Sequence, residues 1–188
     1  MTGYANHAKE LSELLLASVD AGDDIDRAVG VIADALSSGH KVLVCGNGGS
    51  AADSQHFAAE LVGRYSTERG AYAAIGLSAD MSIVTAVGND YGFEFIFARQ
   101  IEALGNPGDV LVVISTSGMS QNLVEAVKTA RLRELKVITF TGRNANHWLA
   151  DADVWVPIDS THVAHIQEIQ IAMLHSVCAG IEQLLEGQ

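Results

Sequence analysis

Five short apolar runs, each of five or six residues, alternate along this chain with longer segments of helical character. They occupy residues 41–45, 72–77, 110–114, 136–140 and 154–158 and read KVLVC, YAAIGL, VLVVI, KVITF and VWVPI. Apolar strands that alternate with helices are typical of a parallel sheet covered by helices on both faces. The sequence therefore predicts an α/β fold, a doubly wound five-stranded parallel sheet flanked by helices.

The segments between and around these runs predict the helices. With 188 residues and no internal repeat or linker, the chain is expected to be one domain, 1–188, with an N-terminal helical segment, 1–39, and an α/β core, 40–188. A leucine-rich first helix is compatible with packing on another subunit and equally with packing within the chain. The expected helices are 4–19, 25–36, 51–64, 80–87, 93–104, 120 or 121 to 134, a short turn before the last strand, and 161–185.

Composition excludes several classes of function. Lys and Arg total 11 against 23 Asp and Glu, for a net charge of −12, and no basic cluster is present, so nucleic acid is not an expected partner. No run approaches the roughly 18 apolar residues of a membrane span, and the first residues do not resemble a signal peptide. Cys45 and Cys178 lie in apolar surroundings and are expected to be buried reduced thiols. We expect a soluble, cytoplasmic protein without a membrane partner.

The stretch 46–60, GNGGSAADSQHFAAE, joins the first expected strand to a helix through a glycine-rich turn. Free backbone N–H groups and the helix dipole make such a turn an anion site. Ser50 is the expected N-cap, with Asp53 at N3 as a partial capping box. His56 and Glu60 follow one helical turn apart and therefore on one face.

Two further polar turns are expected at the same edge of the sheet. STSGMS, 115–120, follows a buried strand and opens a helix, while GND, 88–90, is predicted as a turn. Hydroxyls and backbone N–H groups suit a phosphate monoester, although an ordinary serine-rich loop is the alternative. Ligands of parallel sheets bind at the carboxyl ends of the strands, so convergence of the three turns favours a phosphate site.

His56 and Glu60 admit two interpretations, a metal or acid–base pair, or a surface histidine beside an ion pair of Glu60 with Arg64. Gln167 and His175 lie on the last helix, about 80° apart around it and ~12 Å along it at 1.5 Å per residue. One metal could join all four only if the side chains lean together, if the helix begins after Gln167, or if different subunits contribute.

Four blocks, GNGGSAADSQHFAAE, VGNDYGF, ALGNPGDVLVVISTSGMS and IQEIQIAMLH, resemble in this order the bacterial phosphoheptose isomerases of the sugar-isomerase (SIS) fold, a flavodoxin-like fold. The resemblance runs from about residue 10 to residue 183. It implies a homotetramer with active sites between subunits and a divalent metal, usually Zn²⁺, one per subunit. The implied metal ligands are His56, Glu60, Gln167 and His175. The implied substrate contacts are Asn47, Gly48, Gly49, Ser50, Glu60, Asn89, Asp90, Ser115, Thr116, Ser117, Ser120 and Gln167.

The activity that this resemblance implies is conversion of sedoheptulose 7-phosphate to D-glycero-D-manno-heptose 7-phosphate through an enediolate. It is the first step toward ADP-heptose or GDP-heptose and hence a source of lipopolysaccharide precursor. Such a reaction needs a base, an acid and stabilisation of a developing oxyanion. Glu60 suits the base and His175 the second proton transfer, while zinc would polarise the substrate oxygens. Because a zinc-bound Glu60 is a poorer base, Asp90 is a third candidate catalytic residue.

Two alternatives use the same fold. One is a non-catalytic binding protein that resembles the bacterial initiator-associating protein, a tetramer that binds DnaA; those relatives lack the acid and histidine that match Glu60 and His175. The other is a sugar-phosphate sensor domain, which is disfavoured because no DNA-binding segment is attached. The presence of Glu60, His175 and the GNDYGF block favours the enzyme.

Overall fold

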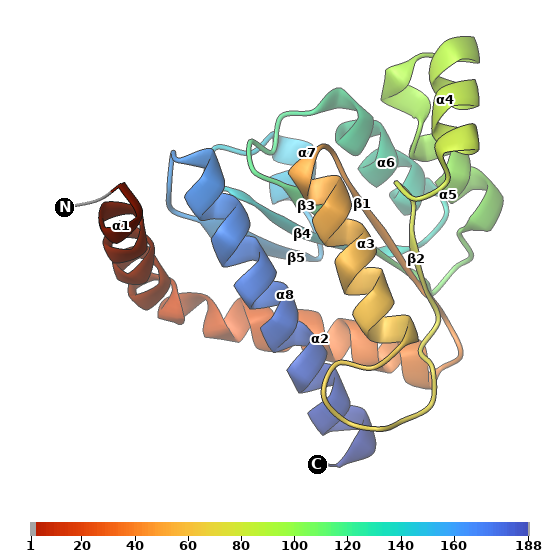
Figure 1. Ribbon diagram of the computed structural model, residues 1–188. Helices are drawn as coiled ribbons and strands as arrows, with labels where there is room; N and C mark the ends of the chain where they lie inside the picture. Colours follow the sequence, from red (N-terminus) through yellow and green to blue (C-terminus); the bar gives the residue numbers. More distant parts are fainter. Residues whose placement is uncertain (1–2, 188) are drawn as a thin grey trace.

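The computed structural model describes residues 3–187 and shows a sheet enclosed by two layers of helix (Figure 1). Its strands are β1 (Val42–Gly46), β2 (Ala74–Gly76), β3 (Val110–Ser115), β4 (Lys136–Gly142) and β5 (Val154–Ile158). Its helices are α1 (Gly3–Ala17), η1 (Val19–Ala21), α2 (Gly22–Ser37), α3 (Gly49–Val62), α4 (Met81–Asp90), η2 (Phe93–Phe95), α5 (Ala98–Leu104), α6 (Gln121–Leu132), α7 (His147–Ala150) and α8 (Val163–Glu186).

All five strands are parallel, in the order β2-β1-β3-β4-β5. Each strand falls within, or one or two residues beyond, an apolar run of the sequence. The order reverses between β1 and β3, where chain connections diverge to opposite sides of the sheet. Ligands of doubly wound sheets bind at such a reversal, and the loops after β1 and β3 meet there. The predicted fold class is confirmed.

Alternate strand residues pack into two separate cores, as the period of two requires. Val44 and Val112 face a core shared with α2, α3 and α8, whereas Cys45 and Val113 face one shared with α5, α6 and α7. Each core is continuous along its face of the sheet. The two cores explain why the central strands are apolar on both faces.

The two cysteines lie in different cores, Cys45 on β1 and Cys178 on α8. Both are free and buried, so the predicted pair of reduced thiols is confirmed. Burial raises the pKa of both thiols, that of Cys178 to about 12. Neither thiol is therefore suited to nucleophilic chemistry near neutral pH.

Two boundaries around α4 differ from the sequence prediction. The helix passes through Gly88 and ends at Asp90, so the predicted GND turn is its last turn. Gly92, with φ +104°, is the glycine that reverses the chain. The expected helix 93–104 is divided into η2 and α5, and the buried Gln100 amide donates to the Ile96 and Leu77 carbonyls at the break, at 2.8 and 2.9 Å.

α1 is poorly covered by the rest of the chain. None of its residues is buried, and Leu16 is 75% exposed. Figure 1 shows its first turns beside the start of α8, and Leu11 and Leu14 pack on the α8 side core. No helix in residues 3–187 combines the length and the apolar character that a membrane span needs.

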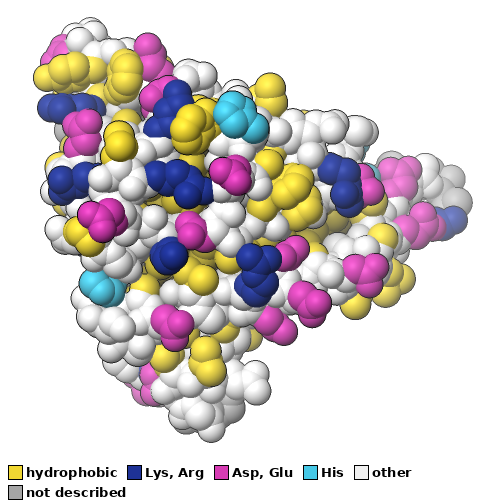
Figure 2. Space-filling model, turned by 180° about the vertical axis from the view of Figure 1, so that it is seen from behind, with side chains coloured by type: hydrophobic (Ala, Val, Ile, Leu, Met, Phe, Trp, Pro, Cys, Tyr) yellow, Lys and Arg dark blue, Asp and Glu magenta, His cyan; other side chains and the backbone are white. Residues whose placement is uncertain are grey.

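Charged side chains are mixed on the face opposite to that of Figure 1. Figure 2 shows Lys and Arg interspersed there with Asp and Glu. Binding of the phosphate backbone of a nucleic acid would require basic side chains gathered in a patch or stripe, with few acidic side chains among them. This face therefore offers no such patch.

Candidate active site

Glycines shape the turn between β1 and α3. Gly48, with φ +57°, is the N-cap of α3, which begins at Gly49. The prediction that Ser50 caps this helix is wrong, because Ser50 lies buried in the first turn and Gly48 takes the cap position. A Cβ atom at Gly49 would overlap the amide of Gln167, so this glycine leaves room for that amide beside the N-terminus of α3.

A pair of asparagines joins the turn after β1 to the helix after β3. Asn47 and Asn122 each donate their amide to the other's oxygen, both at 2.8 Å. Asn122 is 2% exposed and lies in the first turn of α6. The sequence does not predict this role of Asn122, because an asparagine inside a predicted helix gives no periodic or motif signal.

The STSGMS loop folds as a tight turn between β3 and α6. Ser115 Oγ accepts a hydrogen bond from Gly118 N at 3.0 Å, and Ser117 Oγ accepts one from Met119 N at 3.3 Å. Ser120 is the N-cap of α6, yet its hydroxyl makes no capping bond. Thr116, half-buried, completes the hydroxyl-rich loop. The loop offers hydroxyls and a helix N-terminus without a cation.

An open pocket of about 410 Å³ lies between these two loops. Asn47 and Ser120 come from the turns themselves, while Phe93 and Glu94 come from η2. The remaining walls are Gln121 and Asn122. Two of the three predicted polar turns therefore border one space.

His56, Glu60 and His175 lie together where α3 faces α8. His56 Nε2 is 3.1 Å from Glu60 Oε1, and the rings of His56 and His175 are 5.1 Å apart between centroids. The Tyr65 ring also contacts the His175 ring, with 5.5 Å between their centroids. The His56 side chain is 45% exposed and that of Glu60 24%, so the group borders solvent. An accessible carboxylate that contacts one imidazole, with a second imidazole against the first, can accept, hold and pass a proton.

Gln167 lies near the glycine turn, with its amide beside Gly49, and it hydrogen-bonds to Asp53. Burial raises the pKa of Asp53, against the lowering effects of the Gln167 hydrogen bond and the nearby His56. Asp53 Oδ2 is buried without a hydrogen-bond partner. The sequence predicts Asp53 as a capping residue only, whereas in the structure it interacts with both Gln167 and His56.

Gln170, another residue whose role the sequence does not predict, ties α8 to the sheet edge. Its amide donates to the carbonyl oxygens of Ser115 and Phe140, at 3.2 and 2.9 Å. It is fully buried, so α8 is fixed against the ends of β3 and β4. This anchor sets the height at which Gln167 and His175 face α3.

Asn89 and Asp90 stand apart from these groups. They end α4, exposed, and the Asn89 amide donates to Asp90 Oδ1 at 2.7 Å. In Figure 1, α4 rises beyond the carboxyl edge of the sheet, away from the α3–α8 contact. Within one chain the third predicted turn therefore does not join the other two.

The chemistry of His56, Glu60, Gln167 and His175 fits a divalent metal such as zinc, which takes imidazole nitrogen and carboxylate oxygen. α8 begins at Val163, so the helix does not start after Gln167, and that route to a shared metal is wrong. Among residues 3–187, the group of three His, Cys, Asp or Glu side chains with ligand atoms all within 4.8 Å is His7, His165 and Glu168. The predicted ligands are thus neighbours in a looser arrangement.

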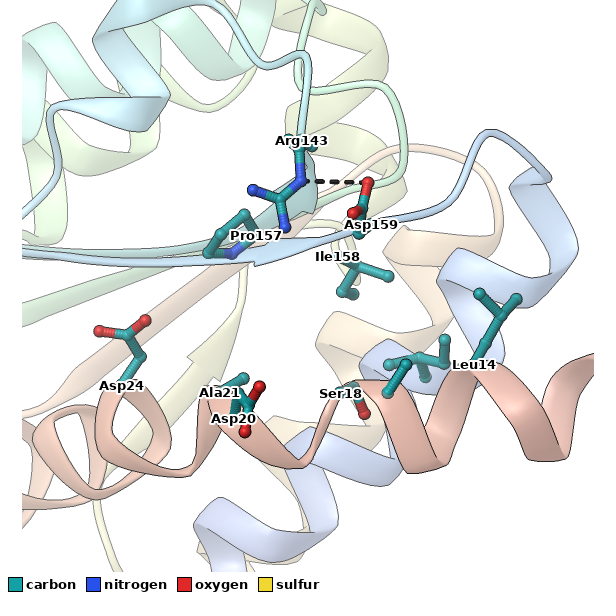
Figure 3. Close-up of a pocket in the computed structure, with 11 residues that line it drawn as sticks. Leu14, Ser18, Asp20, Ala21, Asp24, Arg143, Pro157, Ile158 and Asp159 are labelled. Atoms are coloured by element: carbon teal, nitrogen blue, oxygen red, sulfur yellow. Dashed lines mark ion pairs between the residues drawn. The ribbon is translucent and has the colours of Figure 1, made fainter.

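A second cavity, of about 420 Å³, lies between the α1–α2 corner and the end of β5, and none of the predicted site residues lines it. Figure 3 shows Asp20 and Asp24 across from Arg143, which pairs with Asp159 at 3.1 Å. Leu14 closes the α1 side. Its walls carry neither the glycine turn nor the imidazoles, so size alone does not mark the reactive site.

Comparison with known proteins agrees with this geometry. The SIS domain model matches residues 4–142. Phosphoheptose isomerases of Campylobacter concisus and Bordetella avium are 44% and 46% identical over 181 and 190 residues, covering 96% and 100% of this chain and 94% and 95% of theirs. The structure of phosphoheptose isomerase GmhA from Neisseria gonorrhoeae superposes with a TM-score of 0.90 at 41% identity, covering 96% of this chain and 97% of the other. The chain therefore belongs to the SIS domain family and, within it, to the phosphoheptose isomerases.

Proposed function

We propose that this chain is a ketose–aldose isomerase that converts sedoheptulose 7-phosphate to D-glycero-D-manno-heptose 7-phosphate. The observation that carries the proposal is the meeting of Glu60, His56 and His175 where α3, the helix that follows the glycine turn, faces α8. The relatives named above are isomerases over nearly the whole chain, which favours an enzyme over a binding protein of the same fold. The aldose product would supply synthesis of nucleotide-activated heptoses.

Glu60 serves as the base in this proposal. It removes a proton from C1 of the ketose, and the resulting enediolate is reprotonated at C2. His175 moves the second proton, between the two substrate oxygens, because its ring lies next to His56, which in turn contacts the Glu60 carboxylate. Asp90 is the alternative acid or base, and it would have to reach the site from a different subunit or after movement of α4.

The phosphate binds at the two loops at the sheet edge. The N-termini of α3 and α6 direct backbone N–H groups and helix dipoles toward it. Ser115, Thr116, Ser117 and Ser120 supply hydroxyls, while Asn47, Gly48, Gly49 and Ser50 form the opposite edge. The Asn47–Asn122 pair holds both edges at a fixed separation. Gln167 contacts the sugar, and Asn89, like Asp90, would do so from a different subunit or after movement of α4.

The metal proposal rests on donor chemistry. His56, Glu60, Gln167 and His175 would hold one Zn²⁺ per subunit, which when bound supplies a Lewis acid that polarises the substrate oxygens. Asp53 hydrogen-bonds to Gln167 and so orients its amide. Hydrogen-bond partners of metal ligands commonly fix the direction in which the ligand points.

We propose further that the chain assembles as a cytoplasmic homotetramer with sites between subunits. Two features support assembly: α1 exposes apolar side chains such as Leu16, and Asn89 and Asp90 stand away from the other site residues. A neighbouring subunit that covers α1 would account for the first feature. A site shared between subunits would account for the second.

Incubation of purified protein with sedoheptulose 7-phosphate and with shorter ketose phosphates, each with and without added zinc, tests the function. We expect an aldose phosphate from the seven-carbon substrate, formed faster with zinc. Turnover of only a shorter ketose phosphate would contradict the substrate assignment. Absence of any aldose under all metal conditions would contradict the isomerase itself.

A further inference from the structure

A cluster of histidines lies outside the site described above, where the N-terminal part of α1 meets the first turns of α8. His7 comes from α1, and His165 and Glu168 come from α8. His162, the N-cap of α8, stands next to them, with its ring centroid 4.3 Å from that of His165. Figure 1 shows the two helix ends side by side.

Donor atoms in this cluster are already close. His7 Nε2 lies 2.8 and 3.0 Å from the two carboxylate oxygens of Glu168, and His7 Nδ1 lies 3.2 Å from His165 Nε2. One ligand atom from each of the three residues lies within 4.8 Å of the others. Ligands of a tetrahedral zinc ion bound at about 2.0–2.1 Å are ~3.3 Å apart. The cluster therefore needs only small side-chain shifts to surround an ion.

The donor set selects the class of ion. Two or three imidazoles with one carboxylate suit Zn²⁺ and its neighbours Co²⁺ and Ni²⁺, whereas Mg²⁺ and Ca²⁺ prefer oxygen ligands. Both ring nitrogens of His7 already have a hydrogen-bond partner, Glu168 at Nε2 and His165 at Nδ1. An ion would therefore replace one of these two hydrogen bonds. His165 is 3% exposed, which would shield one side of the ion from water. His162 or a water would provide the fourth ligand.

The cluster is distinct from the predicted active-site metal ligands although it adjoins Gln167 in sequence. At about 100° per residue, His165 lies roughly 200° around α8 from Gln167. Gln167 faces Gly49 and Asp53 of α3, whereas His165 and Glu168 face His7 of α1. The two sets of ligands therefore lie on different sides of the same helix.

From this geometry we infer that His7, His165 and Glu168 form a second divalent-cation site, of the zinc class, that fastens α1 to α8. α1 has no buried residue, so its attachment depends on few contacts. An ion bound only by the folded arrangement stabilises that arrangement by mass action. The alternative interpretation of the same atoms is a hydrogen-bonded His7–Glu168 pair that holds α1 in place without any metal.

Zinc and cobalt titrations of full-length variants separate these readings. The background variant His56→Asn with His175→Asn removes two predicted active-site ligands, so an active-site ion does not contribute. In this background we add His7→Asn, chosen because His7 is half-buried and its loss spares the core. His147→Asn, an exposed histidine on α7, is the matched control.

We expect the background protein to bind one equivalent of Zn²⁺ and to give a visible Co²⁺ spectrum of a nitrogen–oxygen site. His7→Asn should weaken binding by roughly tenfold or more, since even loss of an outer-shell partner has that effect, and His147→Asn should not. Zinc should also slow hydrogen exchange of the α1 amides only where His7 is present.

A background protein that binds no zinc would overturn the inference, as would zinc binding that is indifferent to His7→Asn. Zinc binding that leaves α1 exchange unchanged would overturn the fastening of α1. These outcomes do not depend on isomerase activity, so failure here is separable from failure of the proposed function.

Discussion

Two glutamates on neighbouring helices near Cys178 behave in opposite ways. Both carboxylates raise the pKa of that thiol, which places each of them close to it, after the larger effect of burial. Glu182 on α8 is 3% exposed and accepts hydrogen bonds from the loop after α3. Its donors are the backbone N–H groups of Tyr65, Ser66 and Thr67, the hydroxyls of Ser66 and Thr67, and Arg69 Nε. Glu60 on α3 has His56 beside it and an edge open to solvent.

The difference teaches which carboxylate can do chemistry. Burial opposes ionisation of Glu182, but the hydrogen bonds, first that of the Thr67 hydroxyl, outweigh it and lower its pKa. A carboxylate saturated with donors has no free lone pair for a substrate proton. Glu60 keeps that capacity. Arg69 connects the two, because it pairs with Glu182 at 3.0 Å and donates through Nη2 to the Glu60 carbonyl at 2.8 Å.

The strongest test of the contrast removes the open carboxylate. Glu60→Gln, and separately His175→Gln, should lower kcat by roughly 10²–10⁴-fold, because a positioned base or acid contributes that much. Steady-state kinetics with sedoheptulose 7-phosphate measures the loss, and urea unfolding should show a folded protein. Glu102→Gln, on the exposed surface of α5, is the control. If either variant kept more than about a tenth of wild-type kcat, the residue replaced in it would not be a catalytic residue.

Removing the carboxylate of Glu182, which is saturated with hydrogen bonds, should lower the stability of the fold and leave catalysis intact. Glu182→Gln leaves Arg69 buried with a neutral partner, and breaking a buried ion pair is destabilising by about 3–5 kcal/mol. The free energy of unfolding in urea measures this effect. kcat per folded molecule should stay near wild type, at a temperature where the variant is folded. A stable but inactive variant would invert our assignment of the two residues.

The pH dependence of stability tests the same contrast between Glu182 and Glu60. The pKa of Glu182 is lowered from an ordinary value of 4.5, so the unfolded chain takes up this proton first as the pH falls. The carboxylate therefore contributes stability above about pH 4.5 that is lost progressively below it. Between pH 6 and pH 3 the urea midpoint of wild type should fall further than that of Glu182→Gln. Equal falls would mean that Glu182 titrates normally in the folded protein.

The smallest effect is expected at the phosphate loop. Ser120 caps α6 without spending its hydroxyl on the cap, and a hydrogen bond to a charged group contributes roughly 1.5–3 kcal/mol. Ser120→Ala should raise KM for the phosphorylated sugar by about tenfold, with kcat affected less than in Glu60→Gln. Binding of a dephosphorylated sugar should be weak and barely changed. Equal weakening of both sugars would assign the loop to the sugar ring or to the fold.

Local pattern was sufficient for most of the fold. The apolar runs predict every strand, because buried parallel strands need apolar residues on both faces. Boundaries at glycines were less predictable, since Gly88 and Gly92 are alike in sequence and only the second adopts a positive φ. The Ser50 prediction was wrong for the same reason, because Gly48, two residues before the serine, is the N-cap.

Residues that act across elements were harder to predict. Asn122 and Gln170 bridge loops and strands that are 75 and 55 residues away in the chain, so no local period reveals them. Glu182 gives no motif, although it holds the loop that follows the Glu60 helix. The looser set of His56, Glu60 and His175 was visible from helical spacing on α3 and from family resemblance on α8.

Isomerisation in D₂O, with wild type, Glu60→Gln and Glu182→Gln compared at equal concentrations of folded protein, tests most directly whether Glu60 is the proton-transferring carboxylate. Product formation and deuterium at C2 of the aldose are scored together, because a hydride shift forms product without solvent deuterium. We predict deuterated product from wild type and Glu182→Gln and almost none from Glu60→Gln. Product that never carries deuterium, or undiminished product from Glu60→Gln, would contradict the account.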